Sequence, residues 1–267
     1  MKWLATLICL AMGSVASAQT TSLRTLDTDY SAASWKAMGR IDFGRRAFCS
    51  GTLIAPDLVL TAAHCLYRPG SNRLWPTDSI RFHAGLRDGD AVATRAARGA
   101  AAHEKFDPIG PLTAQNVAHD VALIRLDEPI STFDVPPFYI HNDRIAPGPV
   151  SVVSYGRDRA NAQSQQKQCQ MLSQLGDAMV FDCDVTYGSS GSPVFSHLNG
   201  RGRIMAVISG MMEIDGQKRS VGMVLPERVN ELKGQLRMQV APPTAKARRI
   251  TVGGGARNNT GAKFVRP

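Results

Sequence analysis

Most of this sequence predicts an all-β fold of the barrel or sandwich type. From Trp35 onward, short strand-like runs are separated by Gly, Pro, Asn and Asp, as in antiparallel strands joined by tight turns. Several runs alternate apolar and polar residues or are apolar throughout, and amphipathic stretches of helix length are scarce. The predicted strands lie at 53–54, 58–60, 79–82, 121–126, 150–154, 180–181, 194–195, 204–209 and 221–225.

One helix is predicted, and it closes the folded part near residue 240. Pro226 suits a first-turn position, where its missing N–H would have no intrahelical partner in any case. Val229, Leu232 and Leu236 then fall on one face of the helix. This face is expected to pack against the β structure.

The two ends of the chain have the composition of segments outside the fold. Residues 1–18 resemble a signal peptide, with the charged Lys2, a short apolar run and a small-residue cleavage site. That run is too short to cross a bilayer, so we expect an exported protein (periplasmic or extracellular) with no transmembrane segment. Residues 19–35 are expected to form a lead-in or short propeptide, and residues 241–267 a basic disordered tail.

The formal net charge of +9 is concentrated in the tail. Residues 241–267 carry six basic side chains and no acidic one, and Lys2 belongs to the signal segment. Together these account for seven of the nine charges. The folded part therefore lacks the excess of positive charge that nucleic-acid binding requires, and no nucleic-acid partner is expected. The tail itself is either a solvated linker or a dock for an anionic surface.

Export makes the cysteines candidates for disulfides. Cys9 leaves with the signal peptide, and the remaining Cys49, Cys65, Cys169 and Cys183 permit three pairings. The simplest is local, Cys49–Cys65 and Cys169–Cys183, each closing a loop of about fifteen residues and contributing about 3 kcal/mol. A zinc site is disfavoured because no C-x-x-C spacing is present, so no metal or other cofactor is expected.

The stretch from Asp184 to Phe195 carries the strongest chemical signal, and its centre reads G-x-S-G-x-P around Ser190. A nucleophilic serine needs an uncrowded hydroxyl and backbone N–H groups aimed at the oxygen that becomes negative during acyl transfer. Gly188 has no Cβ and can turn its peptide toward that oxygen. We therefore predict an oxyanion hole formed by the N–H groups of Gly188 and Ser190. Gly/Ser-rich segments also form plain turns, so this interpretation needs support elsewhere.

Two other segments supply that support. His64 follows a short apolar run and precedes Cys65, and a histidine with a pKa near 6.5 can take the proton from a serine hydroxyl at neutral pH. Asp120 stands at the start of the apolar run 121–126, where it would be a turn residue or cap, or would accept Nδ1–H of His64.

The segments T-A-A-H-C, D-V-A-L-I and G-S-S-G-S-P, in that order, resemble the chymotrypsin/trypsin family of serine endopeptidases. C-S-G-T-L-I before the histidine and V-S-V-V-S-Y-G at the start of the second half are also similar. The resemblance implies two six-stranded antiparallel β-barrels within residues 36–240, with barrel 1 about 36–140 and barrel 2 about 141–240. It also implies the Cys49–Cys65 bridge, and a cleft between the barrels with His64, Asp120 and Ser190.

The chain departs from the family pattern at two points. Ser189 stands where animal digestive members carry an aspartate that captures a new N-terminus, so activation by that ion pair is not supported. In this respect the chain is more similar to the bacterial glutamyl-endopeptidase-like branch, but Ile208 falls where that branch carries a pocket histidine. We expect Asp184, Ser209 and Gly210 to line the substrate pocket. Asp184 would pair with a substrate Arg or Lys at its base, or would simply cap a turn.

The sequence thus predicts an exported serine endopeptidase that acts on protein or peptide substrates as a monomer. Ser190 is the expected nucleophile, His64 the base and then the acid, and Asp120 the residue that orients His64. The alternative is a protease-fold binding protein without catalysis.

Overall fold

The structure is a computed structural model that describes residues 20–44, 46–142, 146–197 and 202–240. Six antiparallel strands close a first barrel in the order β2-β3-β4-β7-β6-β5. The strands are β2 (Met38–Phe43), β3 (Ala47–Ala55), β4 (Leu58–Thr61), β5 (Ile80–Ala84), β6 (Ala93–Ala102) and β7 (Ala122–Leu126). The predicted signal peptide and basic tail lie outside the described residues.

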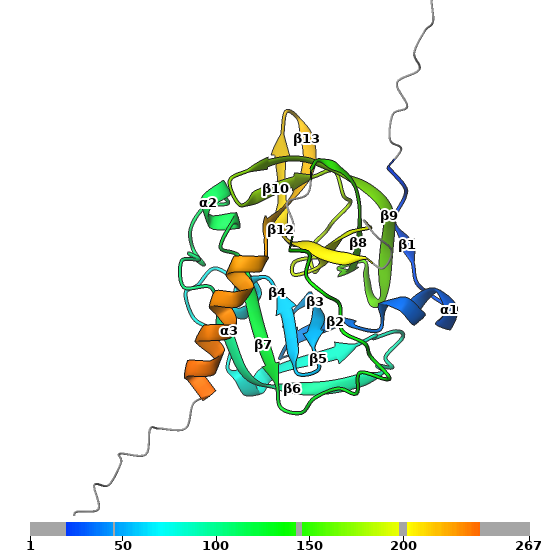
Figure 1. Cartoon of the computed structure of the whole chain (residues 1–267), viewed down its shortest axis with the longest axis vertical. Coiled ribbons are helices and arrows are strands. Elements are labelled where there is room, and N and C mark those ends of the chain that lie inside the picture. The colour runs from blue at the N-terminus through cyan, green and yellow to red at the C-terminus, as the bar shows by residue number, and fades with distance from the viewer. Residues whose placement is uncertain (1–19, 45, 143–145, 198–201, 241–267) are drawn as a thin grey trace, which may run out of the picture.

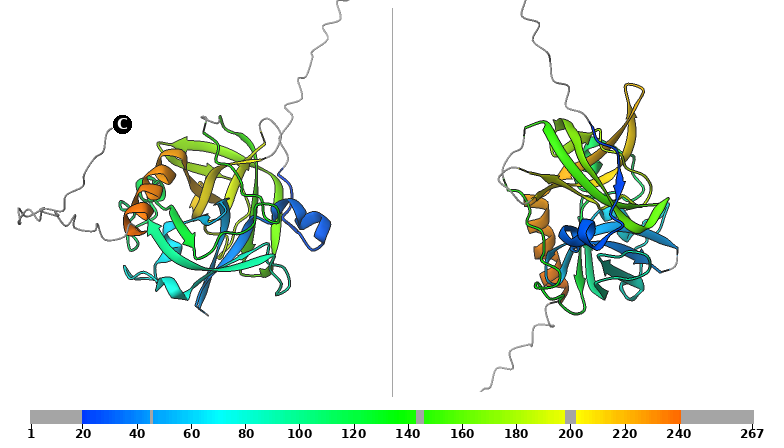
Figure 2. Two further views of the ribbon diagram at one scale, coloured as in Figure 1. Left: turned by 60° about the horizontal axis from the view of Figure 1, so that its bottom comes forward. Right: turned by 90° about the vertical axis from the view of Figure 1, so that its right-hand side faces the viewer.

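A second barrel follows in the chain and lies beside the first (Figures 1 and 2). Its order is β9-β10-β13-β12-β11-β8, and it is closed by pairing of β8 with β9. The strands are β8 (Gly148–Gly156), β9 (Arg159–Leu175), β10 (Ala178–Phe181), β11 (Pro193–Ser196), β12 (Arg203–Ile214) and β13 (Gln217–Val224). The predicted all-β fold with two six-stranded barrels and a C-terminal helix is confirmed.

Besides the two-residue strand β1 (Arg24–Thr25), three strands of the barrels were not predicted, because their sequences do not look like strands. β6 reads ATRAARGAAA, and a run so rich in alanine has a higher intrinsic preference for helix. β9 is a long, largely polar run that contains many glutamines, and β2 is interrupted by Arg40 and Asp42. In each case both neighbouring strands supply hydrogen-bond partners, so pairing in the barrel outweighs local propensity.

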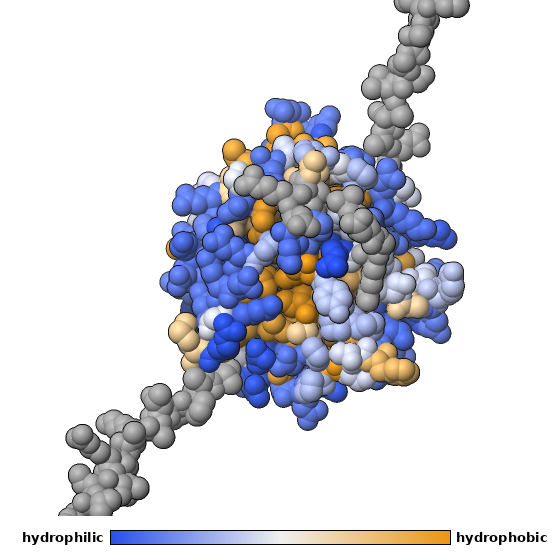
Figure 3. Space-filling view, in the orientation of Figure 1, coloured by the Kyte–Doolittle hydropathy of each residue, from blue (hydrophilic) through white to orange (hydrophobic). Residues whose placement is uncertain are grey.

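The helix α3 (Pro226–Val240) follows the last strand of barrel 2 but packs on barrel 1. Val229, Leu232 and Leu236 are buried in the same apolar cluster as the core of barrel 1, which confirms the predicted helix and its buried face. Figure 1 shows α3 alongside β7. Its outer face is hydrophilic, and apolar side chains gather beside it near the centre of the same view (Figure 3).

The remaining helices are short. They are α1 (Asp29–Ala32), α2 (Ala114–Val117) and the 3-10 turns η1 (Ala33–Trp35), η2 (Ala63–Leu66) and η3 (Thr77–Ser79). None of the helices in the described ranges is long and apolar enough to span a bilayer.

The segment from residue 20 to Trp35, predicted as a lead-in, packs along barrel 2. Strand β1 (Arg24–Thr25) pairs with β9, and Leu26 is buried. Thr28 caps α1, since its side chain accepts from the N–H of Ser31. The ring of Trp35 then contacts the rings of Phe138 and Phe195.

Two disulfides join the cysteines by the local pairing that was predicted. Cys49 of β3 is bonded to Cys65 of η2, and Cys169 of β9 is bonded to Cys183, two residues after β10. The first bridge attaches η2 to barrel 1, and the second ties the segment leading to Ser190 to barrel 2.

The second bridge closes a loop with a sequence separation of 14 residues. Replacing both cysteines (C169A/C183A) removes this restraint from the unfolded chain. The free energy of unfolding should fall by about 3 kcal/mol. Urea unfolding followed by circular dichroism measures it, and the m-value should rise because the unfolded chain becomes less compact. An unchanged midpoint would contradict a stabilising role for this bridge.

Candidate active site

His64 is held by the short turn that ends the β4 segment. β4 is fully buried, and η2 follows after Ala62. The disulfide from Cys65 to Cys49 fastens this turn to β3, so the backbone that carries the imidazole has little freedom. The side chain of His64 is 36% exposed, which leaves one edge of the ring accessible.

Asp120 approaches His64 from the segment between α2 and β7. It is nearly fully buried, and its carboxylate is held by three donors. Oδ1 accepts the backbone N–H of His64 at 2.8 Å, and Oδ2 accepts Nδ1–H of the same residue at 2.7 Å. Oδ2 also accepts the hydroxyl of Ser209 at 2.5 Å. Because Nδ1 of His64 donates here, Nε2 is left free to act as a base.

Ser190 joins this pair through Ser209 of β12. The hydroxyl of Ser190 donates to the carbonyl oxygen of Ser209 at 3.4 Å, a long hydrogen bond. The hydroxyl of Ser209 binds Asp120, as described above. Ser209 therefore contacts two of the three residues predicted to be catalytic.

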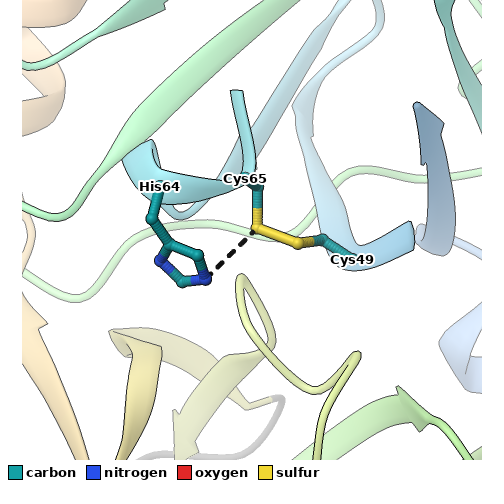
Figure 4. A group of neighbouring side chains, drawn as sticks. All are labelled: Cys49, His64 and Cys65. Atoms are coloured by element: carbon teal, nitrogen blue, oxygen red, sulfur yellow. Dashed lines mark hydrogen bonds between the residues drawn. A yellow bond between two sulfur atoms is a disulfide. The ribbon is translucent and has the colours of Figure 1, made fainter. Parts of the chain in front are cut away.

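Nε2 of His64 is 3.8 Å from Sγ of Cys65 (Figure 4). Within the described ranges, no hydrogen bond joins Nε2 to the hydroxyl of Ser190. Figure 4 shows the ring extending from η2 toward the ribbon of barrel 2. A long or unformed bond between base and nucleophile is common in sites without substrate, and it shortens when substrate binds.

Hydrogen bonds to individual carbonyl groups orient the backbone around Ser190. The carbonyl of Tyr187 accepts the N–H of Arg157 at 2.7 Å, and the carbonyl of Ser189 accepts the N–H of Ser192 at 3.0 Å. In a trans peptide the N–H points opposite to the C=O. The N–H groups of Gly188 and Ser190 therefore point away from these partners, and among the described residues neither has an acceptor. Two N–H groups without an acceptor are one requirement of the predicted oxyanion hole.

Two glycines in this turn are required by their surroundings. Gly188 has φ +91°, and a Cβ there would lie 2.3 Å from the ring of Phe48. Gly191 has φ +80°, and a Cβ there would lie 2.2 Å from the carbonyl oxygen of Ser50. The turn of barrel 2 is therefore in close contact with β3 of barrel 1.

Ser189 occupies the position where the sequence departs from the family pattern, and its hydroxyl is fully buried. It donates to the carbonyl of Tyr155 at 3.0 Å and accepts Nη2–H of Arg159 at 3.2 Å. Nη1 of Arg159 donates to the carbonyl of Ser154 at 2.7 Å. Burial lowers the pKa of Arg159, and Asp184 and Asp158 act against that shift. Arg159 was not predicted, because no motif surrounds it and β9 was not predicted as a strand.

Of the three residues predicted to line the substrate pocket, Ser209 and Gly210 are neighbours in β12, and Asp184 follows Cys183 in the segment before Ser190. Ser209 is part of the site through Asp120, and a Cβ on Gly210 would lie 3.9 Å from the side chain of Leu112. Asp184 is exposed, and its N–H donates to Oε1 of Gln166 at 2.7 Å. Across the part of the chain that the structure describes, no hydrogen bond or ion pair links Asp184 to Ser209 or Gly210.

The electrostatics of the site favour a protonatable His64. Burial of the ring lowers its pKa, whereas the charge of Asp120 and the hydrogen bond to that carboxylate raise it. The two effects of Asp120 together outweigh burial, so the pKa of His64 lies above its usual value of 6.5. Cys49 and Cys65 lie close to His64, but their sulfurs are in a disulfide and are not thiolate ligands for a metal.

Sequence comparison supports the same interpretation as the geometry. Residues 49–207, more than half of the chain, match the trypsin-like peptidase domain family. Human transmembrane protease serine 5 is 39% identical over 100 residues, which are 38% of this chain and 21% of that protein. Bovine coagulation factor XII is 42% identical over 82 residues, 30% of this chain and 12% of that protein. This chain therefore matches only a small part of the curated relatives' length.

Comparison of structures shows the fold over most of the chain. A Glu endopeptidase in complex with MPD superposes with a TM-score of 0.67 at 18% identity, covering 82% of this chain and 98% of that one. The thermostable serine protease AL20 from an extremophilic microorganism superposes with a TM-score of 0.62 at 17% identity, covering 77% and 99%. Together, the two closed barrels and the match over residues 49–207 establish that this chain belongs to the trypsin-like peptidase domain family.

Proposed function

We propose that this protein is a serine endopeptidase in which His64, Asp120 and Ser190 act as a catalytic triad. The observation that carries the proposal is the bidentate contact of the buried Asp120 with His64, together with the bridge from Asp120 through Ser209 to Ser190. We infer that the contact with Asp120 orients the imidazole and selects the tautomer with Nε2 free, and that the bridge through Ser209 keeps Ser190 in position to act as the nucleophile.

In the acylation step, the hydroxyl oxygen of Ser190 forms a bond to the scissile carbonyl carbon while His64 takes the hydroxyl proton at Nε2. The negative oxygen of the tetrahedral intermediate accepts the N–H groups of Gly188 and Ser190. The C–N bond then breaks, and His64 gives its proton to the leaving amine. Asp120 stabilises the imidazolium during both transfers.

In the deacylation step, water attacks the ester carbon and passes a proton to Nε2 of His64. The ester bond then breaks, the proton returns to Ser190, and a peptide with a free carboxyl group leaves. All of these groups come from one chain, and we propose that the protein acts as a monomer. We further propose that it is exported, since its two disulfides are stable in an oxidising compartment.

Cleavage of a mixed peptide library by the purified protein tests the activity. We expect cuts that vanish in Ser190→Ala, together with labelling of the wild type, but not of that variant, by a fluorophosphonate probe. The same variant controls for contaminating proteases, since it passes through the same purification. A correctly folded wild type that neither cleaves nor labels would instead indicate a protease-fold binding protein.

The raised pKa of His64 predicts the pH dependence. His64 must be neutral to accept a proton and is protonated below its pKa, so kcat/KM should fall with decreasing pH through an apparent pKa above 6.5. Asp120→Asn removes the charge that raises this pKa while burial remains. The pKa of His64, followed by NMR of the imidazole protons, should fall, and kcat should drop by about 10⁴-fold. An unshifted His64 titration would contradict the coupling to Asp120.

Asp184 gives a separate expectation about specificity. If its carboxylate forms the base of the pocket, the library should be cut after Arg or Lys, and Asp184→Asn should lose this preference. If Asp184 only caps its turn, the variant should keep the wild-type cleavage pattern. Asp182→Asn serves as a nearby control, because that carboxylate accepts the N–H of Gln170 on barrel 2. Cuts after acidic or apolar residues would reject the pocket role of Asp184.

A further inference from the structure

We infer that Ser50, on β3 of barrel 1, is a positioning residue that holds the oxyanion turn of barrel 2 in its productive orientation. The oxyanion turn is the segment from Tyr187 to Gly191. This inference rests on the proposed function, because it assigns a task to a residue that touches neither the substrate nor the reacting atoms.

Ser50 contacts the oxyanion turn with both its side chain and its backbone. Its hydroxyl donates to the carbonyl oxygen of Gly188 at 2.9 Å, and its N–H donates to the carbonyl oxygen of Ser190 at 2.9 Å. The two carbonyls belong to the peptides 188–189 and 190–191. One residue of barrel 1 thus fixes two of the four peptides in the turn.

The peptide 188–189 lies between the two peptides that present the oxyanion donors. Its carbonyl is held by Ser50, and its N–H, on Ser189, donates to the carbonyl of Thr186 at 2.9 Å. Gly188 has a positive φ and no Cβ, so steric contacts within this residue do little to prevent rotation of the peptide 188–189. The orientation must therefore come from the hydrogen bonds at its two ends.

The hydroxyl of Ser50 is itself fixed. Ser50 is fully buried, and its Oγ accepts the N–H of Tyr155 at 2.9 Å while donating to Gly188. Its carbonyl accepts the hydroxyl of Thr61, three residues before His64, at 2.9 Å. Every hydrogen-bonding group of Ser50 is therefore used, and its partners lie on both barrels. Removing the hydroxyl takes this partner from the partly buried carbonyl of Gly188 and from the buried N–H of Tyr155.

The test compares Ser50→Ala with Ser151→Ala. Ser151 is as buried as Ser50, and its hydroxyl is 2.7 Å from Nε2 of His197, so it controls for the loss of a buried hydroxyl. Removing an oxyanion donor outright costs about 10²- to 10³-fold in kcat. Because Ser50 acts through the peptide, we expect Ser50→Ala to lower kcat by about 10-fold or more with KM changed by less than about twofold.

A peptide aldehyde separates positioning from general damage to the fold. The adduct of the aldehyde with the serine carries an oxyanion. In Ser50→Ala the inhibition constant of the aldehyde should therefore rise by the same factor by which kcat/KM falls. Amide exchange at Ser189 should also become faster, and this readout does not depend on activity. Ser151→Ala should change none of these quantities. Equal kinetics in Ser50→Ala and Ser151→Ala would overturn the inference.

A second pair of variants covers the case in which Ser50→Ala does not fold. Ser50→Thr and Ser50→Val have side chains of nearly the same shape, and only threonine keeps the hydroxyl. We expect the threonine variant to retain most of the wild-type kcat and the valine variant to lose it. Equal activity of the two would reject the role of the hydroxyl. A wild type without any cleavage or labelling would instead be a failure of the proposed function.

Discussion

The buried carboxylate of Asp120 is the constraint on which the rest of the site depends. A charge removed from water is strongly unfavourable unless donors surround it. Here two donors come from His64 on barrel 1 and one from Ser209 on barrel 2. The two barrels can satisfy this group only when they are docked in one relative position. The same docking brings Ser209, whose carbonyl accepts the hydroxyl of Ser190, into contact with Asp120.

Close contact between the turn around Ser190 and β3 also fixes the position of the two barrels relative to each other. Gly191 lies so close to β3 that a single additional carbon would overlap the carbonyl of Ser50. Ser50 binds the turn from one side, while Arg159 and the carbonyl of Tyr155 bind Ser189 of the turn from within barrel 2. The turn is thus held by uncharged hydrogen bonds and one partly buried guanidinium, with Ser189 in place of the aspartate of the family pattern.

The sequence predicted what is encoded locally. His64, Asp120 and Ser190 stand in short motifs whose order along the chain indicated the two barrels, and the helix with Leu232 on its inner face follows from its periodicity. The strands β6 and β9 could not be predicted in this way. Their alanines and glutamines do not favour strands by themselves, and they form strands because they pair with neighbouring strands of the barrel. For the same reason, the contact of Ser209 with Asp120 and the position of Arg159 follow from tertiary packing, which residue spacing does not specify.

Each end of the described chain packs on the barrel that is farther from it in the sequence. Strand β1, which precedes barrel 1, pairs with β9 of barrel 2, and α3, which follows barrel 2, covers β6 and β7 of barrel 1. Each barrel is therefore covered in part by a segment that is separated from it in the sequence by the other barrel. During synthesis all six strands of the first barrel are available before α3, but the surface of β6 and β7 that α3 covers stays open until that helix has been made. The first barrel therefore reaches its final packing only after the second barrel has been synthesised.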